Sequence, residues 1–369
     1  MRPVPPTPAA EGPSPAGGLS AWLGLFRAPN LLTVPGDPIA GFALAHFPAA
    51  DADITWRIAP PAVAAVLLYM AGLVQNDLAD LAEDRRERPA RPLASGAVSV
   101  GSARVAMAAL FVGGIATAAL AGQWALLTAV VLAGLIFAYN RLLRRGSAFG
   151  LLAMGACRGA SLLLGAAAAG LPLESGLESG SPVPTAAFGL AAYIVAVSFV
   201  ARYETTRPAL GEMGYLPLLA AMFWLVGMTH ATNRTWLAAL ALLGLVIFQL
   251  GRTVWAFGEG LLSGDPSQTR RSDNIPAFIG RCIRLLLPIQ AGLVLLSRWP
   301  FQGPFGSVYQ WVLPPEMVER LQELALSPYG LIAVERLQEL ALSPYGLIAA
   351  ALLLAWPAAA LLSRRFYAS

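Results

Sequence analysis

Long apolar runs recur through this chain of 369 residues, and they constrain its fold more than any other feature. Crossing a bilayer as a helix takes about 20 apolar residues, and ten runs approach that length. They lie near residues 30–47, 58–75, 103–121, 124–140, 148–170, 186–203, 214–230, 235–255, 283–298 and 345–362. Because lipid offers the backbone no hydrogen-bond partners, such runs are expected to be helical. The sequence therefore predicts an all-α, polytopic transmembrane bundle of about nine to ten helices.

The composition agrees with an integral membrane protein and argues against a nucleic-acid-binding one. Hydrophobic residues make up 57% of the chain and charged residues 12%. The net charge of +4 comes from arginines dispersed among the apolar runs, not from one basic surface. Alternating the runs across a bilayer places the arginine clusters and both termini on one side, which the positive-inside rule makes the cytoplasm. We therefore expect a protein of the bacterial cytoplasmic membrane with both termini cytoplasmic.

The chain divides into four predicted regions. These are a disordered Pro/Gly-rich cytoplasmic tail (1–20), a transmembrane domain (21–300), a non-cytoplasmic loop (301–345) and a final helix with a cytoplasmic tail (346–369). Near the C-terminus, residues 318–333 are repeated letter for letter as 334–349. A recent duplication or a sequence-assembly error explains such an identical tandem copy better than a structural repeat does.

A cluster of carboxylates closes the second apolar run. Asp77, Asp80 and Asp84 share one face if the helix continues through them. Carboxylates stacked in this way repel each other unless a cation lies among them, and oxygen-only ligands favour Mg²⁺ over zinc. The spacing therefore indicates a magnesium site. The alternative is a solvated acidic turn that is balanced by the arginines after it.

The whole string from Asn76 to Gly96 is more specific than the acidic spacing. It reads N-D-x-x-D-x-x-x-D followed by R-P-x-R-P-L-x-S-G, and it resembles the first signature of the UbiA superfamily of membrane prenyltransferases. The likeness runs from about Arg27 to residues 198–207. It implies an all-helical intramembrane enzyme in which Mg²⁺ joins acidic side chains to an isoprenyl diphosphate. The implied metal ligands are Asn76, Asp77, Asp80 and Asp84, of which the three aspartates are also catalytic.

The same resemblance implies residues that bind the substrate. Asn30 belongs to the family's opening helix and faces the cavity there, and the arginines after the acidic motif suit bidentate contact with phosphate. A tyrosine followed by a short basic stretch ends the fourth run, with arginine where the family carries lysine. These candidates are Asn30, Arg88, Arg91, Tyr139, Arg141 and Arg144. The alternative for the arginines and the tyrosine is an ordinary anchor at the membrane interface.

Arg158 stands alone in an otherwise apolar run of small residues. An arginine within a membrane span is a functional hypothesis by default, whereas snorkelling to the interface is the alternative. Because Arg158 lies well inside the predicted span, we assign it to substrate binding.

The second acidic motif of the family is reduced here. Its position reads S-F-V-A-R-Y-E-T-T-R-P, in which Glu204 is the only carboxylate and is flanked by Arg202 and Arg207. Glu204 is expected to hold one ion as a catalytic residue, or to pair with the two arginines, which suit an anionic headgroup. The string M-G-x-C-R together with R-Y-E resembles the EboC-like branch of the superfamily, which is linked to export of a small metabolite precursor toward the periplasm.

Two functions therefore remain open from the sequence. The first is an enzyme that transfers a prenyl group from a Mg²⁺-bound isoprenyl diphosphate to an unidentified small acceptor. The second is a non-catalytic, EboC-like protein that assists export of a small metabolite or lipid precursor. A generic transporter does not explain the clustered aspartates, and the chain shows no inverted repeat. The expected partners are the isoprenyl diphosphate, the acceptor and membrane lipids, with no nucleic acid.

Overall fold

A computed structural model describes residues 18–46, 56–143, 147–170, 181–202, 211–232, 244, 246–251, 275–297 and 344–367. These residues form helices and turns and no strand, which confirms the predicted all-α fold. The helices are α1 (Leu19–Leu25), α2 (Ala28–Leu31), α3 (Gly36–Ala45), α4 (Ala59–Ala79), α5 (Leu81–Glu87), α6 (Val100–Ala119), α7 (Gln123–Arg141), α8 (Ala148–Ala168), α10 (Pro182–Ala201), α11 (Leu216–Thr232), α14 (Ile275–Arg284), α15 (Leu286–Leu296) and α18 (Pro344–Tyr367), with 3₁₀ turns at Trp56–Ile58 and Gly211–Tyr215.

Six helical stretches in the described part are long and apolar enough to cross a bilayer. They are Trp56–Ala79, Val100–Ala119, Gln123–Arg141, Ala148–Ala168, Pro182–Ala201 and Phe278–Leu296, and two shorter apolar helices are Met213–Met228 and Leu347–Leu362. The predicted count of nine to ten is not reached among these residues. Most of the run predicted at 235–255 lies outside them, as does the duplicated segment except for its last residues, which begin α18.

The first predicted run, 30–47, is broken into the short helices α2 and α3. Pro38 lies in the first turn of α3, where a missing N–H costs no helical hydrogen bond. The break leaves the carbonyl of Thr33 outside both helices. Arg158 from α8 donates to this oxygen at 3.3 Å, and Gln290 from α15 donates to it at 2.7 Å. Side chains of neighbouring helices thus replace backbone bonds that the break removes.

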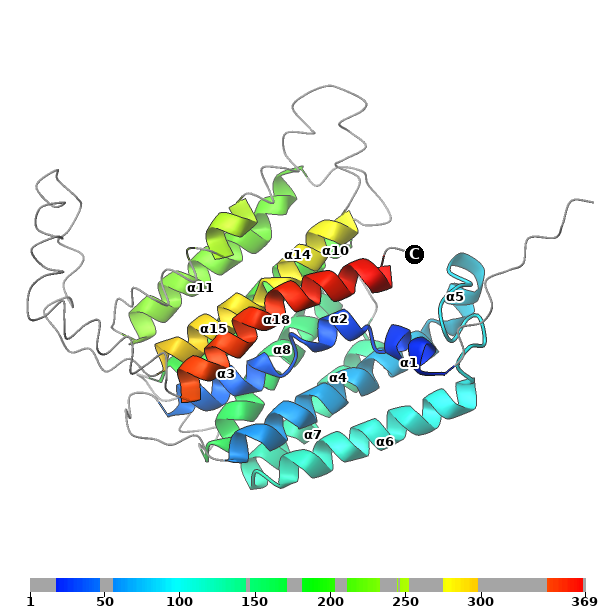
Figure 1. Cartoon of the computed structure of the whole chain (residues 1–369), viewed down its shortest axis with the longest axis horizontal. Helices are drawn as coiled ribbons and strands as arrows, with labels where there is room; N and C mark the ends of the chain where they lie inside the picture. The colour runs from blue at the N-terminus through cyan, green and yellow to red at the C-terminus, as the bar shows by residue number, and fades with distance from the viewer. Residues whose placement is uncertain are drawn as a thin grey trace, which may run out of the picture.

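The helices pack as a bundle in which α8 contacts α3, α7 and α10 (Figure 1). The helix α4 packs on α6 and α7, and α10 packs on α11. At the C-terminal end of the described chain, α18 lies against α15 and also contacts α2. Large apolar side chains are exposed on α6, α7 and α11, among them Val112, Phe137 and Phe223. These outer surfaces suit contact with lipid tails.

Helices α3 and α8 approach each other through glycines. A Cβ added at Gly41 would meet the carbonyl oxygen of Leu162, and one added at Gly165 would meet the backbone of Pro38. Small residues at such crossings let two backbones come close, which is how membrane helices gain packing energy. The contact also fixes Asp37, next to Pro38, against α8.

Replacing Gly165 by alanine should lower the thermal unfolding midpoint of the purified protein in detergent. The added methyl group meets backbone atoms that cannot rotate away, and overpacking of this kind costs about 1–3 kcal/mol. Gly134→Ala on α7 is the matched control, since a Cβ there meets nothing within 4 Å. A midpoint for Gly165→Ala at or above that of the control would contradict the close approach of α3 and α8.

Candidate functional site

The acidic run forms a corner between two helices instead of one straight helix. The helix α4 ends at Ala79, Asp80 occupies the junction, and α5 begins at Leu81. Asp77 therefore lies on α4 and Asp84 on α5. Both of these side chains are buried, whereas Asp80 is half-buried. The corner, and not a continuous helical face, brings Asp77 and Asp84 to one shared partner, Arg91.

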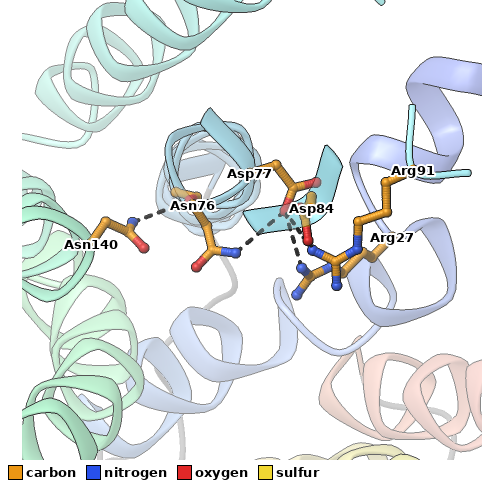
Figure 2. A network of polar contacts seen from close by, with 7 residues as sticks. Arg27, Asn76, Asp77, Asp84, Arg91 and Asn140 are labelled. Carbon is orange, nitrogen blue, oxygen red and sulfur yellow. Dashed lines mark hydrogen bonds and ion pairs between the residues drawn. The ribbon is translucent and has the colours of Figure 1, made fainter. Parts of the chain in front are cut away.

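Two arginines bind these buried carboxylates (Figure 2). Arg91 Nη1 lies 2.8 Å from Asp84 Oδ2 and 3.8 Å from Asp77 Oδ1, and Arg27 Nη2 lies 3.3 Å from the same Asp77 oxygen. Asn76 Nδ2 also donates to Asp77 Oδ1, at 3.3 Å. We call Arg27, Asn76, Asp77, Asp84 and Arg91 the charge cluster. Its two carboxylates and two guanidinium groups sum to zero formal charge, which makes the burial of the two carboxylates tolerable.

Both arginines are held by the local backbone. The N–H of Arg91 donates to the carbonyl of Arg88 at 3.0 Å, and the buried Leu93 just beyond packs in one apolar cluster with Leu25 of α1. Arg27 lies between α1 and α2 with a φ of +49°, in the left-handed region that few non-glycine residues adopt. Backbone outliers of this kind are common at functional sites. The residue with this left-handed backbone, Arg27, is also the one whose guanidinium binds Asp77.

A cavity of about 390 Å³ adjoins the charge cluster. Arg27 and Asn76 belong to both, and three further residues predicted from the sequence line the cavity: Asn30, Tyr139 and Arg158. Most of the remaining lining is apolar, and it includes Val34, Leu73, Leu132, Ile136, Val197, Ile279, Ile283 and Leu286. The cavity suits an elongated ligand with one charged end and an apolar body.

Asn140 lines the cavity beside Tyr139. Its Nδ2 donates to the carbonyl of Gly72 at 3.2 Å and to Gln75 Oε1 at 3.0 Å, which ties α7 to α4 (Figure 2). Its Oδ1 is buried without a hydrogen-bond partner among the described residues. The amino group of Asn140 thus links α7 to α4, while its Oδ1 remains able to accept a hydrogen bond.

Arg158 is buried in a polar network inside the bundle. Its Nε lies 3.0 Å from Asp37 Oδ2, and its Nη2 donates to Asp37 Oδ1 and to the carbonyl of Thr33, each at 3.3 Å. Gln290 Nε2 donates to the same Asp37 oxygen at 2.6 Å. The Asp37 side chain is fully buried and that of Arg158 is 12% exposed, so Arg158 does not snorkel to the interface. The ion pair joins α8 to α3, and the bond from Gln290 adds α15.

Other predicted site residues lie away from the cavity or outside the described chain. Arg88, Arg141 and Arg202 are exposed, and none of them is among the described residues that line the cavity. The guanidinium of Arg202 lies over the ring of Phe199, 5.7 Å from its centre. Glu204, Arg207 and Arg144 fall outside the described residues, so their roles stay predictions.

The residues predicted from the sequence do not include Arg27, Asn140 or Gln290, which the structure brings to the cavity or to its polar network. Arg27 and Asn140 both stand within strings that resemble the family, and their types suit hydrogen bonding to charged groups. Gln290 is the one amide in the apolar run predicted at 283–298. A polar side chain inside a membrane span is a signal that could have identified it.

Among the described residues, no group of three or more His, Cys, Asp or Glu side chains is arranged to hold a metal ion. Mg²⁺ seldom needs such a cage, because proteins usually bind it through one or two carboxylates while water and substrate phosphates complete its shell. Asp77 and Asp84 supply two carboxylates of that kind beside the cavity. The donor set therefore fits a Mg²⁺ ion that is bound together with a phosphate compound.

The family of this protein follows from a sequence match that extends well beyond the acidic motif. The sequence model of the UbiA prenyltransferase family matches residues 38–260, more than half of the chain. This protein belongs to the UbiA prenyltransferase family. As a UbiA protein with six spanning helices in its described part, it is an integral membrane protein. The resemblance of the Asn76–Gly96 string is thus confirmed for the family, although the match does not separate the EboC-like branch.

Individual relatives of this UbiA chain are more distant. A stretch of 157 residues is 32% identical to a digeranylgeranylglyceryl phosphate synthase of Methanoculleus marisnigri, which covers 42% of this chain and 53% of that protein. The chain thus spans about half the length of the curated relatives it matches. A solved structure described as a digeranylgeranylglyceryl phosphate synthase matches with a TM-score of 0.51 and 18% identity over 74% of this chain and 98% of that one. The apo structure of a UbiA homolog from Aeropyrum pernix K1 matches with a TM-score of 0.51 and 21% identity, over 69% and 96%. At these identities the two structures support the fold alone.

Proposed function

We propose that this UbiA-family protein transfers an isoprenyl group from an isoprenyl diphosphate to a small acceptor. The observation that carries the proposal is the charge cluster beside an apolar cavity of about 390 Å³. An isoprenyl diphosphate has the same division into an anionic head and a hydrocarbon tail. The head would lie at the charge cluster and the tail among the apolar lining residues.

Arg27 and Arg91 are the groups that would bind the diphosphate. Guanidinium groups present paired donors that match phosphate oxygens, so both can exchange a carboxylate partner for a phosphate one. That exchange would leave Asp77 and Asp84, with Asn76 and Asp80 beside them, to hold Mg²⁺. Bound Mg²⁺ would neutralise charge on the diphosphate and make it a better leaving group.

The apolar lining would shield the reacting carbon of the donor from water. Side chains such as Leu132, Ile136 and Val197 keep water away from the carbon that loses the diphosphate, which leaves the acceptor as its nucleophile. The carbon–oxygen bond to diphosphate breaks, a bond to the acceptor forms, and the acceptor loses a proton. Asn30 and Tyr139 line the same cavity and would orient the donor. We also propose the roles predicted from the sequence for Glu204, a catalytic residue that holds one ion, and for five arginines that bind the substrate: Arg88, Arg141, Arg144, Arg202 and Arg207.

The acceptor and the location are further parts of the proposal. The curated relatives are digeranylgeranylglyceryl phosphate synthases, so glyceryl phosphate compounds are the first acceptors to test. By the positive-inside rule, the arginine-rich loops would face the cytoplasm across a bacterial cytoplasmic membrane. The diphosphate would then be taken from the cytoplasmic side.

The function is tested by diphosphate release from the purified full-length protein in lipid nanodiscs. Geranyl, farnesyl and geranylgeranyl diphosphate serve as donors over a Mg²⁺ titration, first alone and then with a cell-membrane extract as a source of acceptor. We expect release that requires Mg²⁺ and rises with the extract. Empty nanodiscs with the same extract are the control for contaminating phosphatases.

Two other outcomes contradict the proposal in different ways. Saturable binding of the donor without release, under both conditions, would support the non-catalytic alternative in which the charge cluster only holds a headgroup. Neither binding nor release would exclude both functions.

A further inference from the structure

Arg158 has a hydrogen-bonding edge that the protein does not use. Its Nη2 donates to Asp37 Oδ1 and to the carbonyl of Thr33, and its Nε lies 3.0 Å from Asp37 Oδ2 in an ion pair without hydrogen-bond geometry. Among the described residues, Nη1 has no partner. Because the guanidinium is planar with its donors in a fixed fork, Nη1 cannot turn to Asp37 without breaking that pair. Arg158 is one of the residues that line the cavity.

Ser161 supplies a second unused group on the same helix. It lies three residues after Arg158, which places both on one face of α8, and it lines the same cavity. The residue is 5% exposed, and its Oγ is buried without a hydrogen-bond partner among the described residues. A serine inside a helix commonly bonds the carbonyl four residues earlier, but Ser161 does not. A buried hydroxyl without a partner is costly and calls for an explanation.

The charge around these groups selects the kind of ligand. The positive charge of Arg158 is already balanced by Asp37, to whose Oδ1 Gln290 also donates at 2.6 Å. An anion placed here would bring an unbalanced charge into an apolar interior, at a cost that two hydrogen bonds do not repay. An uncharged oxygen could accept from Nη1 and bond Ser161 Oγ without that cost.

We propose that Arg158 Nη1 and Ser161 Oγ form a subsite for an uncharged hydroxyl group of the acceptor, separate from the charge cluster that holds the diphosphate. The subsite itself rests on the geometry of α8. That the bound alcohol is the acceptor of the reaction rests on the proposed prenyl transfer. The protein therefore takes a lipid-like alcohol at this point of the cavity, and an anionic group on the same acceptor would have to lie elsewhere.

The test measures binding of decan-1-ol to the purified full-length protein in detergent, with radiolabelled alcohol and a scintillation proximity readout. Geranyl diphosphate and Mg²⁺ are present at saturation, and their own binding is measured separately on each variant. Decane and decyl phosphate are unlabelled competitors that differ from the probe only at the head. We expect Ser161→Ala to weaken decanol binding by about five- to tenfold, the effect of one buried hydrogen bond.

Ser198→Ala is the matched control. Its hydroxyl lines the same cavity but already donates to Met154 Sδ at 2.8 Å, so its loss should change decanol binding by less than about twofold. We also expect decanol to compete better than decyl phosphate in the unmutated protein. Equal binding of decanol by Ser161→Ala and the unmutated protein would overturn the subsite. So would a preference for decyl phosphate that Ser161→Ala removes.

The separate donor measurement keeps the two proposals apart. If geranyl diphosphate fails to bind while decanol still depends on Ser161, the prenyl-transfer proposal fails and the alcohol subsite stands. If the donor binds and releases diphosphate while decanol is insensitive to Ser161, the subsite fails alone.

Discussion

Replacing Asp77 by asparagine should lower Mg²⁺-dependent release of diphosphate by about 10²–10³-fold, the range found when one electrostatic contact at a reacting centre is lost. Asp77 Oδ1 is the oxygen on which Arg27, Arg91 and Asn76 converge. The substitution keeps the shape of the side chain but removes a carboxylate that would hold Mg²⁺, and it leaves one guanidinium without a counter-charge. The measurement is the rate of release in nanodiscs at saturating donor.

Glu83→Gln provides the control for Asp77→Asn. Glu83 belongs to the same acidic run but lies exposed on α5. Its replacement by glutamine should therefore change the rate of diphosphate release by less than about twofold, as surface changes usually have small effects. Thermal unfolding of both variants shows whether a lost rate reflects a lost fold. An Asp77→Asn protein that stays folded and releases diphosphate at the unmutated rate would remove the charge cluster from the mechanism.

The second large effect concerns stability. Arg158→Met should lower the free energy of unfolding by about 3–5 kcal/mol, because it leaves the fully buried Asp37 without its cation. The double variant Asp37→Leu/Arg158→Met removes both charges and should be less destabilised than the single one. Denaturant unfolding in detergent micelles measures these two values and that of Asp37→Leu alone, and the difference between the double variant and the sum of the two single variants gives the coupling within the pair.

Arg202→Met is the control for Arg158→Met. Arg202 is exposed at the end of α10 and lies over Phe199, so its loss should cost less than about 1 kcal/mol. Equal costs for the two methionine variants would mean that the pair between Arg158 and Asp37 does not hold α3 to α8.

The sequence was sufficient for the fold class and the family because both depend on local patterns. Apolar runs of bilayer length predict helices wherever they occur, and the string from Asn76 to Gly96 is long enough to be specific. Arg158 was also recognisable, since a lone arginine in an apolar span needs a partner. In each case the signal lies within one short stretch of chain.

What the sequence could not give are the partners that meet across the bundle. Asp77 belongs to a recognisable motif, but nothing near it indicates that Arg27, 50 residues away, binds the same oxygen as Asn76. The corner at Asp80 was likewise not visible, because residues on both sides of it are compatible with helix. Gln290 reaches Asp37 across 253 positions, and only the packing of α15 on α3 brings them together.

The ion pair between Arg27 and Asp77 has a consequence for how this chain can change over generations. Asp77 is buried, so a lineage that loses the base at position 27 leaves the acid at position 77 with less counter-charge and gains by losing that acid as well. Substitutions at the two positions are therefore expected to arise in pairs. A hybrid that joins the first 46 residues of one relative to the remainder of another should be destabilised where its parents differ at both positions, because it can then combine the acid at position 77 of one parent with a position 27 that has lost the base in the other.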